Sequence, residues 1–306
     1  MKNFSALESH CSLSFDQSGP YWHIWTPENH PVIFHDASAF KAGMNILAIC
    51  SRLVPEVNII TFELMSNHIH ITAAGTENNI KKLFALFRRF LGNYLRSKGF
   101  CCDLSSFTPH FRMIGTLQDL RNVISYTNRN GFVISPDDTP FSYRWGANSY
   151  FFNYAAKERY YESTSFLSRT KRRELIRSHD SDTIVKIKTV DDYACPMDFC
   201  AITFAEKLYR NASHYFRDIS RNIEAHKTLA LEIGESIYYS DDELFSIISN
   251  ICKERYGQYK PSLIPANAKR ELAIQLHRDY NAGNKQIHRL LKIDLATLAQ
   301  LFPEQH

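Results

Sequence analysis

The sequence lacks any long hydrophobic run. No stretch approaches the roughly 18 apolar residues that a membrane-spanning helix needs, and residues 1–16 lack the apolar region of a secretory signal peptide. We therefore expect a cytoplasmic protein with no membrane partner. With 44% apolar and 22% charged residues, the chain has the composition of an ordinary globular protein.

Cysteine motifs and nucleotide-binding loops are also missing. The seven cysteines form an odd set without a C-x-x-C pair, which excludes zinc ribbons and indicates reduced, structural thiols. No G-x-x-x-x-G-K-[ST] loop is present, so the chain has no P-loop for ATP or GTP. It also contains no internal repeat and no low-complexity segment.

Net charge is small, but its distribution is uneven. The chain has 36 Lys and Arg against 32 Asp and Glu, a net charge of +4. Residues 250–292 carry nine basic and three acidic residues, whereas residues 181–249 carry seven basic and twelve acidic residues. Residues 151–180 add a net charge of +3. Two basic regions therefore flank an acidic one, a layout that fits an anionic polymer as partner.

The first half of the chain predicts an α+β fold. Aromatic residues 20–26 and the apolar runs 57–65 and 68–74 predict strands, the last two joined by the turn Ser66-Asn67. Asp36 is a good N-cap for a helix that ends before Pro55, and apolar residues at helical spacing predict a helix over 79–98.

A fourth strand over 106–114 and a helix over 117–130, ended by Gly131, follow. The order of elements predicts a ferredoxin-like antiparallel sheet with helices. We expect an all-α C-terminal domain after it, with helices near residues 200–212, 219–231, 241–254, 266–280, 284–291 and 294–301.

Two short motifs contain candidate functional residues. His68 and His70 alternate around Ile69, so on a strand both imidazoles point to the same side and could hold one metal ion. Tyr126 and Asn130 are four residues apart, which makes them neighbours on one helical face. Each motif alone is also compatible with ordinary strand histidines and a packing tyrosine.

Together the motifs resemble those of the REP-associated tyrosine transposases, a branch of the insertion-sequence transposases with one tyrosine and an HUH (His-hydrophobic-His) motif. Residues 65–70 (Met-Ser-Asn-His-Ile-His) resemble the family's Met-Pro-Asn-His-Val-His, and residues 126–131 (Tyr-Thr-Asn-Arg-Asn-Gly) its Tyr-Ile-x-x-Asn-Pro. Residues 31–36 and the segment from Ser135-Pro136 to residues 141–144 resemble two further landmarks. Ser66 and Gly131 replace the family's usual prolines.

The resemblance covers residues 18–152 and implies a metal-dependent DNA transposase, a site-specific endonuclease that cleaves and rejoins single-stranded or hairpin DNA. It implies that His68, His70 and Asn130 ligate Mg²⁺ or Mn²⁺ and that Tyr126 attacks the DNA to form a 5′-phosphotyrosine. It leaves a monomer or a homodimer open, and it places the protein in the cytoplasm at the nucleoid. We therefore divide the chain into an HUH single-tyrosine transposase domain (1–152), a basic/acidic linker (153–199) and a helical domain (200–306).

Basic side chains are candidates for binding DNA phosphates. The candidates in the first two regions are Arg88, Arg89, Arg96, Arg172 and Arg173. In the tail, residues 269–301 have the pattern of a helix-turn-helix, in which Lys285 and Arg289 could contact duplex DNA. A helical bundle that only braces the protein predicts the same pattern.

Two other functional classes remain open. A domesticated protein could bind DNA hairpins without cutting them, and it would tolerate phenylalanine at position 126. An RNA-binding or metal-dependent phosphodiesterase on the same fold would use His68 and His70 as acid and base. Such a site would usually need a second histidine pair, but the sequence has no other His-x-His.

Overall fold

A computed structural model describes residues 20–100, 103–133, 139, 141–176, 186–221 and 223–303. Contacts divide the chain into two compact units, one formed by Met1–Gly131 and Thr139–Asn222, the other by Phe132–Asp138 and Ile223–His306. Among the described helices, none has the length and apolar composition needed to cross a membrane.

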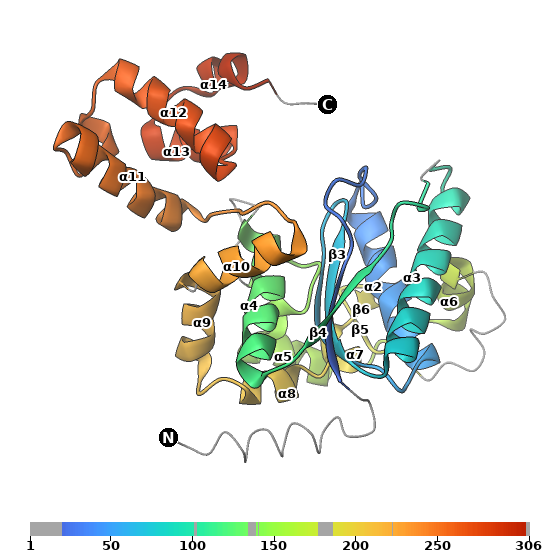
Figure 1. Ribbon diagram of the computed structural model, residues 1–306. Helices are drawn as coiled ribbons and strands as arrows, with labels where there is room; N and C mark the ends of the chain where they lie inside the picture. Colours follow the sequence, from blue (N-terminus) through green and yellow to red (C-terminus); the bar gives the residue numbers. More distant parts are fainter. Residues whose placement is uncertain are drawn as a thin grey trace. The chain divides into compact units, whose positions relative to one another are not determined.

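The first unit is built on a four-stranded antiparallel sheet with the order β2-β3-β1-β4 (Figure 1). Its strands are β1 (Tyr21–Trp25), β2 (Asn58–Leu64), β3 (Ile69–Ala74) and β4 (His110–Ile114). The predicted turn at Ser66-Asn67 is confirmed, because Met65 N–H donates to His68 O across it at 2.9 Å. Mixed α+β structure with an antiparallel sheet is therefore established.

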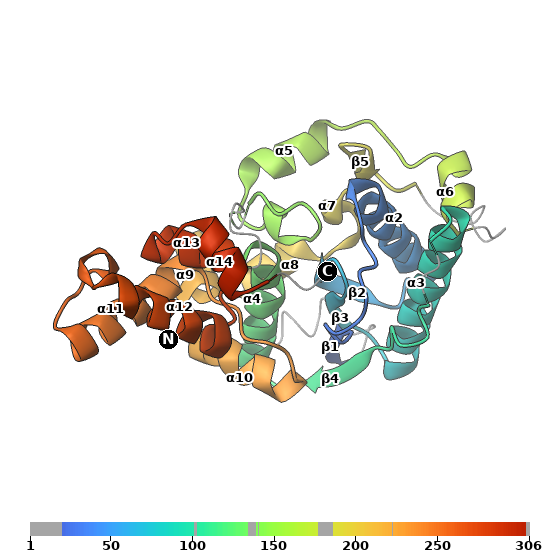
Figure 2. The same cartoon turned by 90° about the horizontal axis from the view of Figure 1, so that it is seen from above.

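One face of the sheet is apolar and lies against α2 (Ala37–Leu53) and α3 (Glu77–Ser97). Both helices begin as predicted: Asp36 accepts a hydrogen bond from Ala39 N at 2.8 Å, and Thr76 caps α3. The helix α6 (Arg169–Ile176) packs beside them. Seen along the other direction, α3 and α4 (Leu117–Val133) flank opposite faces of the sheet (Figure 2).

Two predicted boundaries were wrong. The fourth strand begins at His110 rather than residue 106, because Phe107 N–H donates to Leu104 O and Thr108 N–H donates to Ser106 O, which folds this segment into turns. The helix α4 does not end at Gly131 but continues to Val133. Gly131 is required there by close packing, since a Cβ at this position would lie 2.2 Å from the Tyr143 ring.

The edge strand β2 is covered by two later segments. Leu64 N–H donates to Trp145 O at 2.8 Å, and Ala147 N–H donates to Phe62 O at 3.0 Å. Farther along the strand, Ala201 N–H donates to Ile59 O at 2.7 Å. Residues well beyond 152 thus complete the first unit.

These later residues form short elements in the first unit. They are η1 (Asn148–Tyr150), α5 (Tyr154–Glu162), β5 (Thr189–Val190), β6 (Tyr193–Ala194), α7 (Pro196–Phe199), α8 (Ile202–Lys207) and α9 (Ala212–Arg221). The single helix predicted over 200–212 is wrong: Asn211 accepts a hydrogen bond from His214 N at 2.9 Å and starts a new helix there. Ser135-Pro136 of the sequence resemblance lies outside the described residues.

The described elements of the second unit are all helices. It contains α10 (Ile223–Ile233), α11 (Asp241–Tyr256), η3 (Pro261–Leu263), α12 (Ala266–Tyr280), α13 (Asn284–Leu291) and α14 (Leu295–Leu301). A capping box starts α11, in which Ser240 and Glu243 bond each other's backbone N–H groups. Buried apolar side chains from α11 to α14 form one core, which includes Leu244, Leu272 and Leu298.

Candidate functional site

The sheet face under α4 carries a row of buried polar side chains. In an antiparallel sheet, directly opposed residues share a face, so the pairs Glu63–His70 and His23–Thr72 point to the same side. All four side chains are completely buried, as is that of Thr61. Burial of so many polar groups is costly unless they are hydrogen-bonded. Their concentration on this face therefore marks it as the candidate functional site.

Side chains of α4 complete this polar layer. Thr61 donates a hydrogen bond to the amide oxygen of Asn128, and the hydroxyls of Thr72 and Thr127 lie 3.4 Å apart. The amide of Asn128 in turn donates to the hydroxyl of Tyr215 at 2.7 Å. The resulting network fixes α4 on the sheet and sets the position of every side chain that α4 presents to it.

Three histidines gather at one end of the layer. The rings of His68 and His70 have centroids 5.2 Å apart, and their ligand nitrogens lie within 4.8 Å of one another. His23, on the neighbouring strand β1, stacks on His70 with centroids 5.5 Å apart. The Nε2 of His23 lies 3.3 Å from the Nδ1 of His70, a distance at which one donates a hydrogen bond to the other.

Tyr126 of α4 closes the cluster from the other side. Its ring meets His70 edge-on at a centroid distance of 5.8 Å and His23 at 6.2 Å. The Tyr126 side chain is only 5% exposed. Residues 56 positions apart in the sequence are thus brought into ring contact, which places the predicted nucleophile beside one of the predicted ligands.

Burial keeps these histidines neutral. It lowers the pKa of His68 to about 4 and that of His23 to about 3, the latter with a smaller contribution from the positive charge of Arg112. Burial, followed by the neighbouring His68 and His23, also holds the pKa of His70 well below its usual range. Neutral imidazoles keep a nitrogen lone pair, the form that binds a metal.

The hydrogen bonds of the two motif histidines suit a metal site. The Nδ1 of His68 lies 2.7 Å from the side-chain oxygen of Asn67, and the Nδ1 of His70 is bonded to His23. A histidine that bonds the protein through Nδ1 is oriented to ligate through Nε2, which is the usual arrangement around bound ions. The donor set of His68 and His70 therefore fits a divalent cation.

Asn130 and Gly131 lie one helical turn beyond Tyr126. The Asn130 side chain is half-buried. Gly131 N–H donates to the buried carboxylate of Glu63 at 2.5 Å, and the Tyr143 hydroxyl donates to Leu64 O at 2.6 Å. The Glu63 side chain thus ties this end of α4 to β2, and Tyr143, whose ring packs against Gly131, is bonded to β2 as well.

The predicted DNA-binding arginines of α3 lie elsewhere. Arg88, Arg89 and Arg96 line a hollow of about 550 Å³ together with Gly92 and residues 103–105. Because α3 covers the sheet face opposite α4, this hollow is separated from the histidine cluster by the sheet. The arginines form a group of their own and do not contribute to the cluster.

The other predicted cations are dispersed. Arg172 of α6 is half-buried and donates to Leu167 O at 2.7 Å, whereas Arg173 is exposed. In the second unit, Lys285 is exposed, and Arg289 forms an ion pair with Asp241 at 2.6 Å. This ion pair holds α13 against the start of α11.

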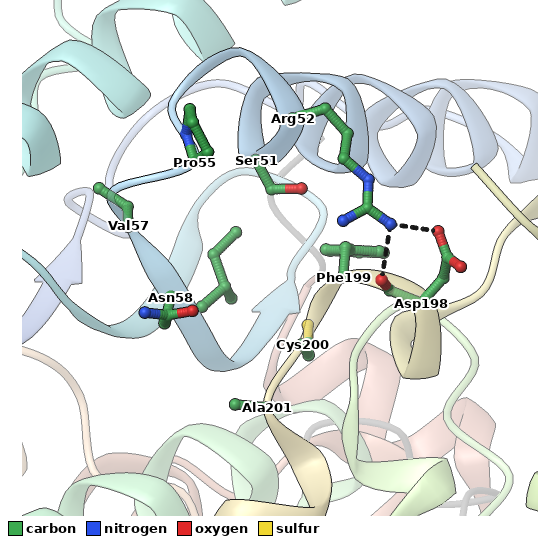
Figure 3. Close-up of a pocket in the computed structure, with 10 residues that line it drawn as sticks. Ser51, Arg52, Pro55, Val57, Asn58, Asp198, Phe199, Cys200 and Ala201 are labelled. Carbon is green, nitrogen blue, oxygen red and sulfur yellow. Dashed lines mark hydrogen bonds and ion pairs between the residues drawn. The ribbon is translucent and has the colours of Figure 1, made fainter. Parts of the chain in front are cut away.

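A second hollow, of about 410 Å³, lies at the far end of β2 (Figure 3). Arg52 points across it to Asp198, with a 2.8 Å ion pair and a 2.9 Å hydrogen bond to the backbone oxygen of the same residue. No member of the histidine cluster lines this hollow. Its charged groups neutralise one another and join α7 to α2.

Sequence reasoning missed His23 and the network behind Tyr126. His23 lies 45 residues before His68, and only the pairing of β1 with β3 brings it to His70. Tyr215, fully buried, connects Asn128 to the Asn148 side chain. The one available clue was the alternation in β1. His23 lies between Trp22 and Ile24 there, so on a strand it points to the face opposite these two apolar side chains.

Comparison with known proteins gives little further support. The chain is similar to a solved structure described as a REP-associated tyrosine transposase bound to a REP hairpin, with a TM-score of 0.32 and 10% sequence identity. The match covers 42% of this chain and 77% of that one. No protein-family model and no curated protein matches the sequence. A similarity this distant does not assign a family, so the function has to be argued from the residues themselves.

Proposed function

We propose that the protein is a metal-dependent DNA strand transferase and endonuclease that uses Tyr126 as its nucleophile on single-stranded or hairpin DNA. One observation carries the proposal: the His68-Ile69-His70 motif and Tyr126, distant in sequence, meet in one buried polar layer. The strand order β2-β3-β1-β4 supports the ferredoxin-like arrangement that the resemblance implies.

The reaction we propose exchanges one phosphodiester for another. The Tyr126 oxygen attacks the scissile phosphorus, a P–O bond to tyrosine forms, the bond to the 3′ oxygen breaks, and the phenolic proton ends on the released 3′-OH. The reverse attack by a 3′-OH rejoins the strand, so no nucleotide is consumed. This agrees with the missing P-loop.

In this proposal His68, His70 and Asn130 hold Mg²⁺ or Mn²⁺, and His23 is a positioning residue that orients His70. When bound, the ion neutralises charge on the scissile phosphate. His23 accepts the hydrogen bond from His70 Nδ1 and leaves Nε2 as the ligand atom. The arginines around the α3 hollow and Arg172 and Arg173 are proposed contacts for DNA phosphates.

The test is a covalent adduct assay. The full chain is incubated with a labelled hairpin oligonucleotide that has a single-stranded tail, in the presence of Mn²⁺, and separated under denaturing conditions. We expect a protein–DNA adduct that disappears in Tyr126→Phe. Tyr94→Phe is the matched control, since Tyr94 is equally buried but belongs to α3. An adduct that survives in Tyr126→Phe would contradict the mechanism.

A non-cleaving hairpin-binding protein is the second candidate. The burial of Tyr126 favours it, because a nucleophile must reach the phosphate that it attacks. If the parent protein binds the hairpin with an affinity that Tyr126→Phe leaves unchanged and forms no adduct with any bacterial repeat hairpin tested, this second function replaces the first.

A further inference from the structure

The last three helices of the second unit form a compact three-helix arrangement. α12 packs on α13, and α13 packs on α14. Their shared core contains Leu276, Ala282, Ile287, Leu291 and Leu298, each at most 1% exposed. Because the contacts between these helices are buried, the angle of α14 to α13 is fixed by packing.

The two turns between these helices are built alike. Asn281 ends α12 and Lys292 ends α13, both with positive φ, at 51° and 57°. An imidazole braces each turn: His277 Nδ1 lies 3.1 Å from Ala282 O, and His288 Nδ1 lies 2.7 Å from Ile293 O. α13 and α14 are thus joined by a short, rigid turn, as the two helices of a helix-turn-helix are.

The outward face of α14 is small and uncharged. Leu298 points into the core, and Thr297 is hydrogen-bonded to the capping Asp294 at 2.6 Å. The exposed side chains are those of Leu295, Ala296, Ala299 and Gln300. Within residues 294–301, the only charge next to this face is the capping carboxylate of Asp294, which is exposed at the N-terminus of α14. The small side chains themselves can enter the DNA major groove, where methyl and methylene groups contact thymine methyls and Gln bonds adenine.

Cations near this helix pair are available for an anionic partner. Within the described residues, Lys269, Lys285 and Lys292 have no ion pair, and Lys285 and Lys292 are exposed. The neighbouring Arg278 and Arg289 are neutralised by Asp279 and Asp241. The surface therefore offers unpaired lysines on the helix that precedes α14 and at the turn, where a helix-turn-helix meets phosphates.

We propose that α12–α14 form a site for duplex DNA, with α14 in the major groove and with Lys285 and Lys292 on the flanking phosphates. With one amide and no charge to read bases, α14 discriminates sequence weakly. Most of the affinity therefore comes from phosphates and falls steeply with salt. This site is separate from the chemistry proposed for Tyr126.

The experiment measures binding of the full chain to a blunt-ended duplex of about 25 base pairs, by fluorescence anisotropy over a range of salt. The double variant Lys285→Glu/Lys292→Glu is expected to weaken binding at least about tenfold. The slope of log affinity against log salt should fall by about two, roughly one for each phosphate that is no longer neutralised. Lys207→Glu, an exposed lysine of α8 in the first unit, is the control for charge.

A second variant tests the groove itself. Ala299→Glu places a carboxylate on the exposed face of α14 and is expected to weaken duplex binding about tenfold or more, with unchanged far-ultraviolet circular dichroism. Tyr126→Phe should bind the duplex like the parent, which separates this site from the proposed chemistry. Binding that Ala299→Glu and the double variant leave unchanged, or no more affected than by Lys207→Glu, overturns the proposal.

Discussion

At the residue scale, His23 decides what His70 can do. The two imidazoles share one hydrogen bond of 3.3 Å between His23 Nε2 and His70 Nδ1. The atom that carries its proton therefore determines the tautomer of His70. If His70 Nδ1–H donates, its Nε2 carries a lone pair. If His23 Nε2–H donates, the proton of His70 lies on Nε2 and blocks a metal. The other ring nitrogen of His23, Nδ1, is buried without a hydrogen-bond partner in the described part of the chain.

Replacing His23 should therefore alter metal binding without touching a ligand. We expect His23→Leu to weaken Mn²⁺ binding by about 10- to 100-fold, as loss of the outer partner of a ligand histidine does. In His23→Gln the amide oxygen can accept the bond from His70, so most of the affinity should remain. Titration calorimetry with Mn²⁺ measures both.

The control for this experiment is His110→Leu. His110 lies on the edge strand of the same sheet and stacks on Trp25, outside the cluster. If His23→Leu binds Mn²⁺ as tightly as His110→Leu, then His23 does not orient His70.

At the element scale, the position of α4 depends on contacts that the sequence motif does not contain. The helix predicted over residues 117–130 is confirmed, and it begins at Leu117 as expected. Its end was mispredicted because a glycine after a helical stretch is usually a cap. Here Gly131 serves a long-range contact with Tyr143, and such contacts leave no local pattern.

Gly131→Ala should destabilise the first unit. The added methyl group would overlap the Tyr143 ring and displace the hydroxyl that bonds Leu64 O, which we expect to cost about 1–3 kcal/mol of the free energy of unfolding. Urea denaturation followed by tryptophan fluorescence measures this, because all three tryptophans lie in the first unit.

Gly115→Ala is the matched control, as a Cβ there meets nothing within 4 Å. It should change the free energy of unfolding by less than about 0.5 kcal/mol. Combining Gly131→Ala with Tyr143→Leu should cost less than the sum of the single changes. Additive costs would show that the two residues do not interact.

At the scale of the whole molecule, the sequence predicted elements better than their assembly. The bounds of α12 and α13 agree with prediction, because their apolar spacing and turn residues are local. The same local patterns could not indicate that α8 and α9 join the first unit, where Tyr215 bonds Asn128 of α4. Nor could they bring β1 beside β3, which is what adds His23 to the site.

The buried histidines should make the first unit sensitive to acid. Their pKa values are lowered in the folded protein, to about 3 for His23 and about 4 for His68, so below pH 6.5 the unfolded chain binds more protons. The free energy of unfolding should then decrease as the pH is lowered below 6.5, by about 1.4 kcal/mol per pH unit for each histidine. Above pH 7.5 it should show no such dependence.

Urea midpoints from tryptophan fluorescence at pH 7.5 and 5.5 test this dependence. His23→Gln should reduce the difference between the two midpoints by about a third, since it removes one of the three histidines in the cluster whose pKa is lowered by burial. The exposed His110, replaced by Gln, should leave it unchanged. Equal midpoints of the parent at both pH values would contradict the expected burial of these groups.

The covering of β2 has a consequence for self-association. Residues 145–147 and 200–201 occupy the backbone groups along its outer side, so no second chain can add a strand there. Among the described residues, nothing pairs with the outer side of β4, where Met113 is exposed. Two copies that joined their sheets into one would have to pair edge to edge, β4 against β4. This pairing would leave the polar layer between the sheet and α4 intact in each copy.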